Sequence, residues 1–179
     1  MKILKAISLL ILAFLITSCS NNSAMKPEDF KNKEPRLIIE EYLSGNVKAW
    51  GVLQNRSGKV TRQFSADLDG TWDGKQLILK EKFNWDDGEV QDREWTITKI
   101  DEHNYEGTAG DVVGKAIGYS YGPAFKFEYV LLVPVKGREL KITFDDWIFK
   151  QDERVAINRA TMTKFGFKVA ELTVVFVKD

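Results

Sequence analysis

The chain has 179 residues, with 26 basic and 26 acidic side chains, one cysteine and one histidine. Because the two signs are balanced and interspersed, no basic patch offers itself to a phosphate backbone, and we expect no nucleic-acid partner. A single cysteine excludes an intramolecular disulfide, and His103 lies in a polar run typical of a turn, so we expect no metal and no cofactor.

The chain begins with the pattern of a bacterial lipoprotein signal peptide. Lys2 and Lys5 form a positive start, residues 7–16 are apolar, and small residues precede Cys19. The apolar segment is shorter than the ~20 residues that a membrane-spanning helix needs. We predict that residues 1–18 are a signal peptide and that Cys19 carries acyl chains such as palmitate. An ordinary cleaved signal or an uncleaved anchor is the alternative.

Lipid attachment would fix the location of the protein. Several acyl chains on Cys19 would hold the chain stably on a membrane, and a mature chain with no other thiol suits an oxidising periplasm. Ser20 follows the cysteine instead of Asp, which by similarity to Gram-negative lipoproteins favours the outer membrane. We therefore expect a lipid-anchored protein of the bacterial cell envelope, on the outer membrane and facing the periplasm. The sequence identifies no protein partner.

The next segment joins this anchor to the folded domain. Residues 19–35 are polar and contain two prolines, so we predict a lipidated flexible tether. Residues 36–44 favour a short helix, because Ile38 and Ile39 each have an apolar partner four residues on and Gly45 supplies a stop. Such an element would close one end of the core; a lid over a cavity is the alternative.

From residue 46 onward, polar and apolar residues alternate, as in strands with one buried and one solvated face. The clearest case is residues 60–72, in which every odd-numbered residue is polar. Similar runs occupy residues 77–85, 90–100, 125–135, 140–150, 155–165 and 167–177. Turn signals separate these runs, whereas recurring glycines interrupt residues 105–121, where we expect bent strands or bulges.

Long hairpin-linked strands with almost no helix would expose unpaired edges unless the sheet closes on itself. We therefore predict an all-β fold: an antiparallel up-and-down barrel of 8–10 strands, lipocalin-like or calycin-like, with a short N-terminal helix. Residues 36–179 would form this barrel as a single domain. A β-sandwich is the alternative, although sandwiches usually have shorter strands.

Several motifs resemble the uncharacterised bacterial lipoprotein family labelled domain of unknown function 3833. They are Val47-Lys48-Ala49-Trp50-Gly51, Gly70-Thr71-Trp72-Asp73-Gly74, residues 83–88, residues 105–114, Phe144-Asp145-Asp146-Trp147 and Asn158-Arg159-Ala160. The resemblance covers essentially the whole chain from about Tyr42. It implies a lipocalin-like fold and a cell-envelope location, but no established activity and hence no catalytic residues.

A barrel of this size can hold a small apolar ligand. Charged residues on otherwise apolar faces are candidate site residues, because an unpaired buried charge is costly. They are Arg62, Glu81, Arg93, Asp146, Arg159 and Glu171. One interpretation is an internal ion-pair network that closes the barrel. The other is that Arg62 or Arg159 binds the carboxylate of a fatty-acid-type ligand, with Tyr119, Tyr121 or Tyr129 assisting.

These patterns favour an envelope lipoprotein that binds or carries a lipid or fatty-acid-like molecule. The candidate ligand-binding residues are Arg62, Arg159, Tyr119, Tyr129 and Glu81, and the sequence indicates no catalytic residue. Two alternatives stay open: a structural or interaction lipoprotein with a barrel filled by its own side chains, and an enzyme acting on lipid or isoprenoid substrates through barrel carboxylates such as Glu81.

Overall fold

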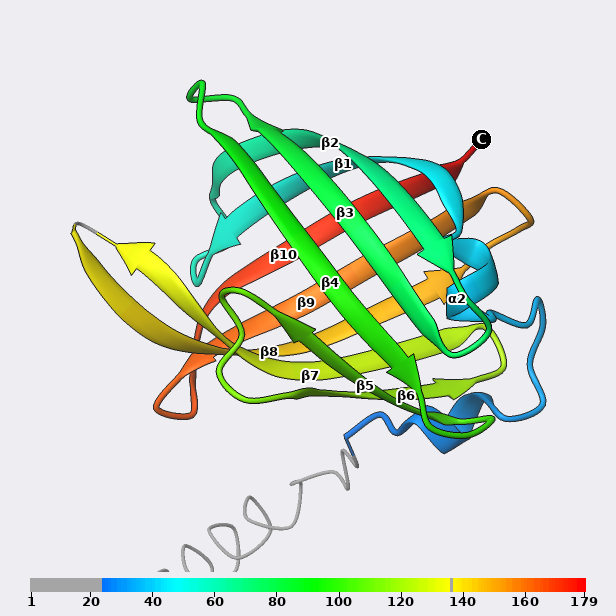
Figure 1. Ribbon diagram of the computed structural model, residues 1–179. Helices are drawn as coiled ribbons and strands as arrows, with labels where there is room; N and C mark the ends of the chain where they lie inside the picture. Colours follow the sequence, from blue (N-terminus) through cyan, green and yellow to red (C-terminus); the bar gives the residue numbers. More distant parts are fainter. Residues whose placement is uncertain (1–23, 136) are drawn as a thin grey trace, which may run out of the picture.

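The computed structural model describes residues 24–135 and 137–179. Over these residues, ten antiparallel strands form a closed barrel in sequence order (Figure 1). They are β1 (Gly45–Asn55), β2 (Val60–Trp72), β3 (Gln76–Trp85), β4 (Val90–Lys99), β5 (Asn104–Ala109), β6 (Ala116–Tyr121), β7 (Ala124–Val135), β8 (Arg138–Lys150), β9 (Val155–Lys164) and β10 (Phe167–Lys178). Each strand pairs with the next, and β1 pairs with β10 to close the sheet. The predicted up-and-down barrel is confirmed.

The alternating runs correspond closely to the observed strands. Residues 60–72 form β2 with the expected bounds, and its even-numbered residues from Phe64 to Gly70 are buried while the odd-numbered ones are exposed. The glycine-rich region holds the two shortest strands, β5 and β6. A Cβ at Gly107 would lie 2.4 Å from the Phe127 ring, so the bare backbone makes room for the aromatic core there.

The described chain before the barrel contains two single helical turns, the 3₁₀ turn η1 (Pro27–Phe30) and the α-helical turn α2 (Ile39–Tyr42). The predicted short N-terminal helix is therefore only one turn long. No helix of the described residues could cross a membrane. η1 lies outside the barrel, where the Phe30 ring centroid is 5.5 Å from that of Phe149. The packed chain thus starts before residue 36. The predicted signal peptide and Cys19 lie outside the described residues.

The turn α2 and its flanks close one end of the barrel (Figure 1). Leu37, Ile39 and Leu43 are buried there. The Lys99 Nζ donates to the Glu40 carboxylate, and the Tyr105 hydroxyl donates to Glu40 Oε2 at 2.9 Å. The expectation that this segment closes one end of the core is confirmed. We call the opposite end, formed by the β1–β2, β3–β4, β5–β6, β7–β8 and β9–β10 connections, the open end, because neither helical turn covers it.

Candidate functional site

A cavity of about 450 Å³ lies inside the barrel. It extends from Ile39 and Leu43 at the closed end to Arg62, Glu89 and Pro134 at the open end. Most of the side chains that line it are aliphatic or aromatic, and they come from α2 and from every strand except β5 and β6. The inward alternation of the strands therefore produces an apolar space along the length of the barrel, within which a few polar groups stand out.

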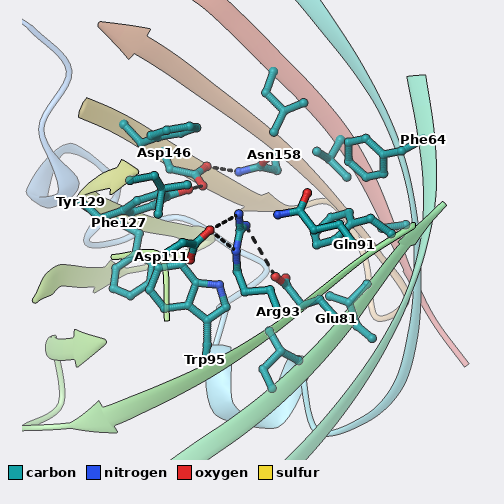
Figure 2. Close-up of a pocket in the computed structure, with 18 of the residues that line it drawn as sticks. Phe64, Glu81, Gln91, Arg93, Trp95, Asp111, Phe127, Tyr129, Asp146 and Asn158 are labelled. Carbon is teal, nitrogen blue, oxygen red and sulfur yellow. Dashed lines mark hydrogen bonds and ion pairs between the residues drawn. The ribbon is translucent and has the colours of Figure 1, made fainter. Parts of the chain in front are cut away.

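Arg93 on β4 is the centre of a charged cluster in this cavity (Figure 2). Its Nη2 and Nε donate to Asp111 Oδ2 at 2.7 and 3.1 Å, and its Nη1 lies 3.9 Å from Glu81 Oε2. The sequence pattern identified Arg93 and Glu81 as charges on apolar faces. It missed Asp111, because this residue lies in the glycine-rich β5–β6 connection, where no alternation indicates the direction of a side chain.

Two oxygen atoms of this cluster have no hydrogen-bond partner among the described residues: Glu81 Oε2 and Asp111 Oδ1 are both buried. Burial raises the pKa of Glu81 to about 7, although the positive charge of Arg93 opposes this rise. A buried polar atom without a partner is unfavourable, so Asp111 Oδ1 and, when Glu81 is ionised, Glu81 Oε2 need a donor from water or from a ligand. The cluster therefore presents unused acceptors to the cavity.

A second polar cluster faces the same cavity from β7, β8 and β9 (Figure 2). The Tyr129 hydroxyl donates to Asp146 Oδ2 at 2.9 Å, and the Asn158 amide donates to Asp146 Oδ1. Burial raises the pKa of Asp146 to about 6. Of the predicted ligand-binding residues, the structure thus brings Tyr129 and Glu81 into these two polar clusters. Asn158 was missed because a neutral amide does not stand out on a strand.

Arg62 lines the cavity at the open end but is not free. Its Nη2 donates to Asp87 Oδ1 and to Glu89 Oε2, each at 2.8 Å. Its guanidinium lies over the Trp85 ring, 4.0 Å from the centroid. Because two carboxylates already occupy its donors, binding a ligand carboxylate would require Arg62 to give up existing partners.

The remaining predicted residues face outward. Arg159 has a side chain that is 63% exposed, and it pairs with Glu171 at 3.4 Å. The sequence analysis placed Arg159 on the inner face because it alternates with Val155 and Ile157, which are apolar. These residues face outward, and the inner face carries the less apolar Ala156 and Asn158. Tyr119 lies on the outer face of β6, since its neighbours Gly118 and Ser120 are the buried residues.

Glu171 was misread for a different reason. The pairing of β10 with β9 shifts between Lys168 and Ala170. An irregularity of this kind changes the face on which the following side chains lie. Val169 packs in the core, and so does Leu172, only three residues later. The alternation that linked Glu171 to Val169 is therefore broken between them.

Comparisons with known proteins agree with this architecture. A family model described as "Protein of unknown function (DUF3833)" matches residues 13–178. No curated protein matches the sequence. The S-type phycobiliprotein lyase CPES from Guillardia theta is similar in structure, with a TM-score of 0.58 and 11% identity over 78% of this chain and 90% of that one.

A protein of unknown function from the DUF3598 family of Nostoc punctiforme PCC 73102 is also similar, with a TM-score of 0.60 and 16% identity. The match covers 82% of this chain and 51% of that one, so the chain spans about half of the Nostoc protein. At these identities the likeness concerns the fold alone, and it supports the expected lipocalin-like barrel.

Proposed function

The chain belongs to the DUF3833 family, and we propose that it is a cell-envelope lipoprotein whose barrel binds or carries an apolar, lipid-like molecule. The observation that carries the proposal is the cavity of about 450 Å³, which falls in the range of about 300–1,000 Å³ typical of small-molecule sites. A barrel filled by its own side chains would not leave this volume, so the cavity favours binding over the purely structural alternative. Membrane attachment through acylated Cys19 remains part of the proposal.

The polar groups in the cavity indicate the chemistry of the ligand's polar end. Arg93 faces two carboxylates, Asp111 and Glu81, and Asp146 adds a third on the opposite wall. A ligand carboxylate would bring further negative charge into this setting, which is unfavourable. A hydroxyl, an amide N–H or an amine could instead donate to the unused oxygens of Glu81 and Asp111. We therefore propose an apolar molecule that ends in a hydrogen-bond donor, in place of the free fatty acid expected from the sequence.

A matched pair of fluorescent long-chain probes tests this proposal. One probe ends in an alcohol and the other in a carboxylate, and both are titrated at pH 8 into the chain from residue 19 onward with Cys19→Ser. We expect saturable binding of the alcohol and at least about tenfold weaker binding of the carboxylate, which corresponds to about 1.4 kcal/mol. Equal or tighter binding of the carboxylate would contradict the proposed polar end.

A pair of tryptophan variants locates the binding. Leu79→Trp places a larger ring in the cavity and should abolish binding of the alcohol probe, whereas Ile117→Trp on the outer face should leave it unchanged. Circular dichroism would verify that both variants fold. If the wild type binds neither probe, and native mass spectrometry of protein purified without detergent shows no lipid, cavity binding itself is wrong.

Catalysis is the second candidate function, and one observation favours it. The Glu81 carboxyl, with a pKa of about 7 inside a cavity, is poised near neutral pH as a general acid or base must be. A changed mass of the recovered alcohol probe after incubation with the wild type, absent with Glu81→Gln, would establish chemistry at this site. An unchanged mass would leave binding as the function.

A further inference from the structure

Exposed large apolar side chains gather at the open end of the barrel. Each of the five connections there has at least one exposed large apolar side chain, either in the connection itself or at the end of an adjoining strand. These residues are Val60, Val90, Val113, Val135, Phe165 and Phe167. The four connections at the closed end have only Ile100 among the described residues. The two ends, which lie on opposite sides of the barrel in Figure 1, therefore differ sharply in apolar character.

The β9–β10 turn presents the most exposed of these side chains. Phe165 is 90% exposed and Phe167 is 75% exposed. The φ angle of Phe165 is +52° and that of Gly166 is +80°, so both central residues of this tight turn have left-handed backbones. Asn or Gly usually occupies such positions, and a bulky aromatic residue there is strained. Since Phe165 gains almost no burial, packing within the barrel does not account for it.

Charge distinguishes one side of the open end. The β1–β2 and β9–β10 connections are neighbours through the β1–β10 pairing, and their basic side chains are Arg56, Lys59, Lys164 and Lys168. No acidic residue lies between Asn55 and Val60 or between Lys164 and Lys168. The β3–β4 connection at the open end is acidic, with Asp86, Asp87 and Glu89. The closed-end connections contain Asp73, Asp101, Glu102, Asp152 and Glu153 beside the basic Lys75 and Arg154. An anionic surface would therefore attract the β1–β2 and β9–β10 side of the open end, where Phe165 and Phe167 lie, and repel the closed end.

We propose that the open end docks on the surface of an anionic phospholipid membrane, with Phe165 and Phe167 entering the headgroup region. Aromatic side chains beside lysines are the composition of interfacial membrane contacts. The proposal rests on the proposed lipid-like ligand, because docking would set the cavity mouth, between Arg62 and Pro134, against the layer that holds such molecules. It adds an orientation that cavity binding alone does not require.

Co-sedimentation with vesicles of phosphatidylcholine and phosphatidylglycerol tests the docking face. The chain from residue 19 onward with Cys19→Ser has no acyl anchor, so its binding reports the barrel. We expect it to bind and to dissociate at high salt. Phe165→Asn with Phe167→Thr should weaken partitioning by about 10- to 100-fold. The matched closed-end variant Ile100→Asn should bind like the parent, because Ile100 is similarly exposed but lies at the other end. Absence of binding by the parent, or an equal loss with Ile100→Asn, would overturn the proposal.

A fluorescent label reports the depth of each end. The Cys19→Ser chain has no other thiol, so a cysteine introduced by Phe165→Cys or Ile100→Cys is a unique attachment point for a polarity-sensitive dye. We expect a blue shift with vesicles at position 165 and none at position 100. A shift that follows protein concentration without vesicles would show that a second copy covers this face, which would overturn membrane docking.

The alcohol probe, titrated without vesicles, separates this proposal from cavity binding. The Phe165→Asn, Phe167→Thr variant should bind the probe as the parent does, since neither side chain lines the cavity. Probe binding without vesicle binding would leave the cavity function standing and refute the docking face. Vesicle binding without probe binding would support the docking face and refute ligand binding in the cavity.

Discussion

Replacing Glu81 by Gln should stabilise the protein above neutral pH and leave its stability nearly unchanged at low pH. The pKa of the Glu81 carboxyl rises from 4.5 to about 7 on folding, mainly because the side chain is buried. Between these values the folded state holds a proton that the unfolded state has lost, so stability falls as pH rises through this window. At about 1.4 kcal/mol for each pH unit, the full loss above pH 7 is about 3 kcal/mol. Gln resembles the protonated side chain and should avoid this loss.

Urea unfolding of the wild type and Glu81→Gln at a series of pH values between about 4.5 and 8 measures this difference. We expect the variant to be more stable by about 3 kcal/mol at pH 8, with the gap closing toward pH 4.5. Glu94→Gln, an exposed position on the outer face of the adjacent strand β4, should change stability by less than about 0.5 kcal/mol. A gap that is constant with pH, or that widens on acidification, would refute the assignment of Glu81 as a buried carboxyl with a raised pKa.

Three further variants test the Arg93–Asp111 ion pair, the packing at the closed end and the proposed lipid attachment at Cys19. Arg93→Met leaves Asp111 without its buried partner and should lower the free energy of unfolding at pH 7 by about 3–5 kcal/mol, measured in urea; a loss below about 1 kcal/mol would contradict the ion pair. Gly70→Ala would place a Cβ 1.9 Å from the Leu43 carbonyl oxygen and should lower the melting temperature by several degrees, whereas an unchanged value would count against this close approach. Cys19→Ser should move the protein out of the membrane fraction after a high-salt wash, which also releases protein docked only through the barrel, as immunoblotting of fractionated cells would show. Retention after this wash would contradict lipid attachment.

Alternation predicts a strand and its facing wherever the two faces differ in polarity. β2 meets this condition, and its bounds and buried face follow from the sequence. β9 does not, because Val155 and Ile157 face outward while Ala156 and Asn158 face inward. The sequence therefore located β9 as a strand but placed Arg159 on the wrong face. The irregularity between Lys168 and Ala170 is a property of the pairing of two strands, so no single strand displays it.

The candidate site was only partly predictable for a related reason. Glu81, Arg93 and Asp146 stand out as charges among apolar residues, and all three line the cavity. Their partners come from other structural elements: Asp111, the partner of Arg93, lies in a connection between strands, 18 residues along the chain. Which charges pair, and which acceptors are left without donors, depends on the curvature and closure of the sheet, and a one-dimensional pattern carries no information about either.

The pairing of β1 with β10 has a consequence for how the protein folds. Every other strand pair joins neighbours in sequence, whereas the closing pair aligns Val47 with Lys178. Local hairpins can form early, but this last seam must bring together residues more than 100 positions apart, which makes closure a slow, entropically costly step. Until β10 arrives, the nine preceding strands expose two unpaired edges to any neighbouring chain. A chain interrupted within β10 should therefore aggregate instead of forming a smaller barrel.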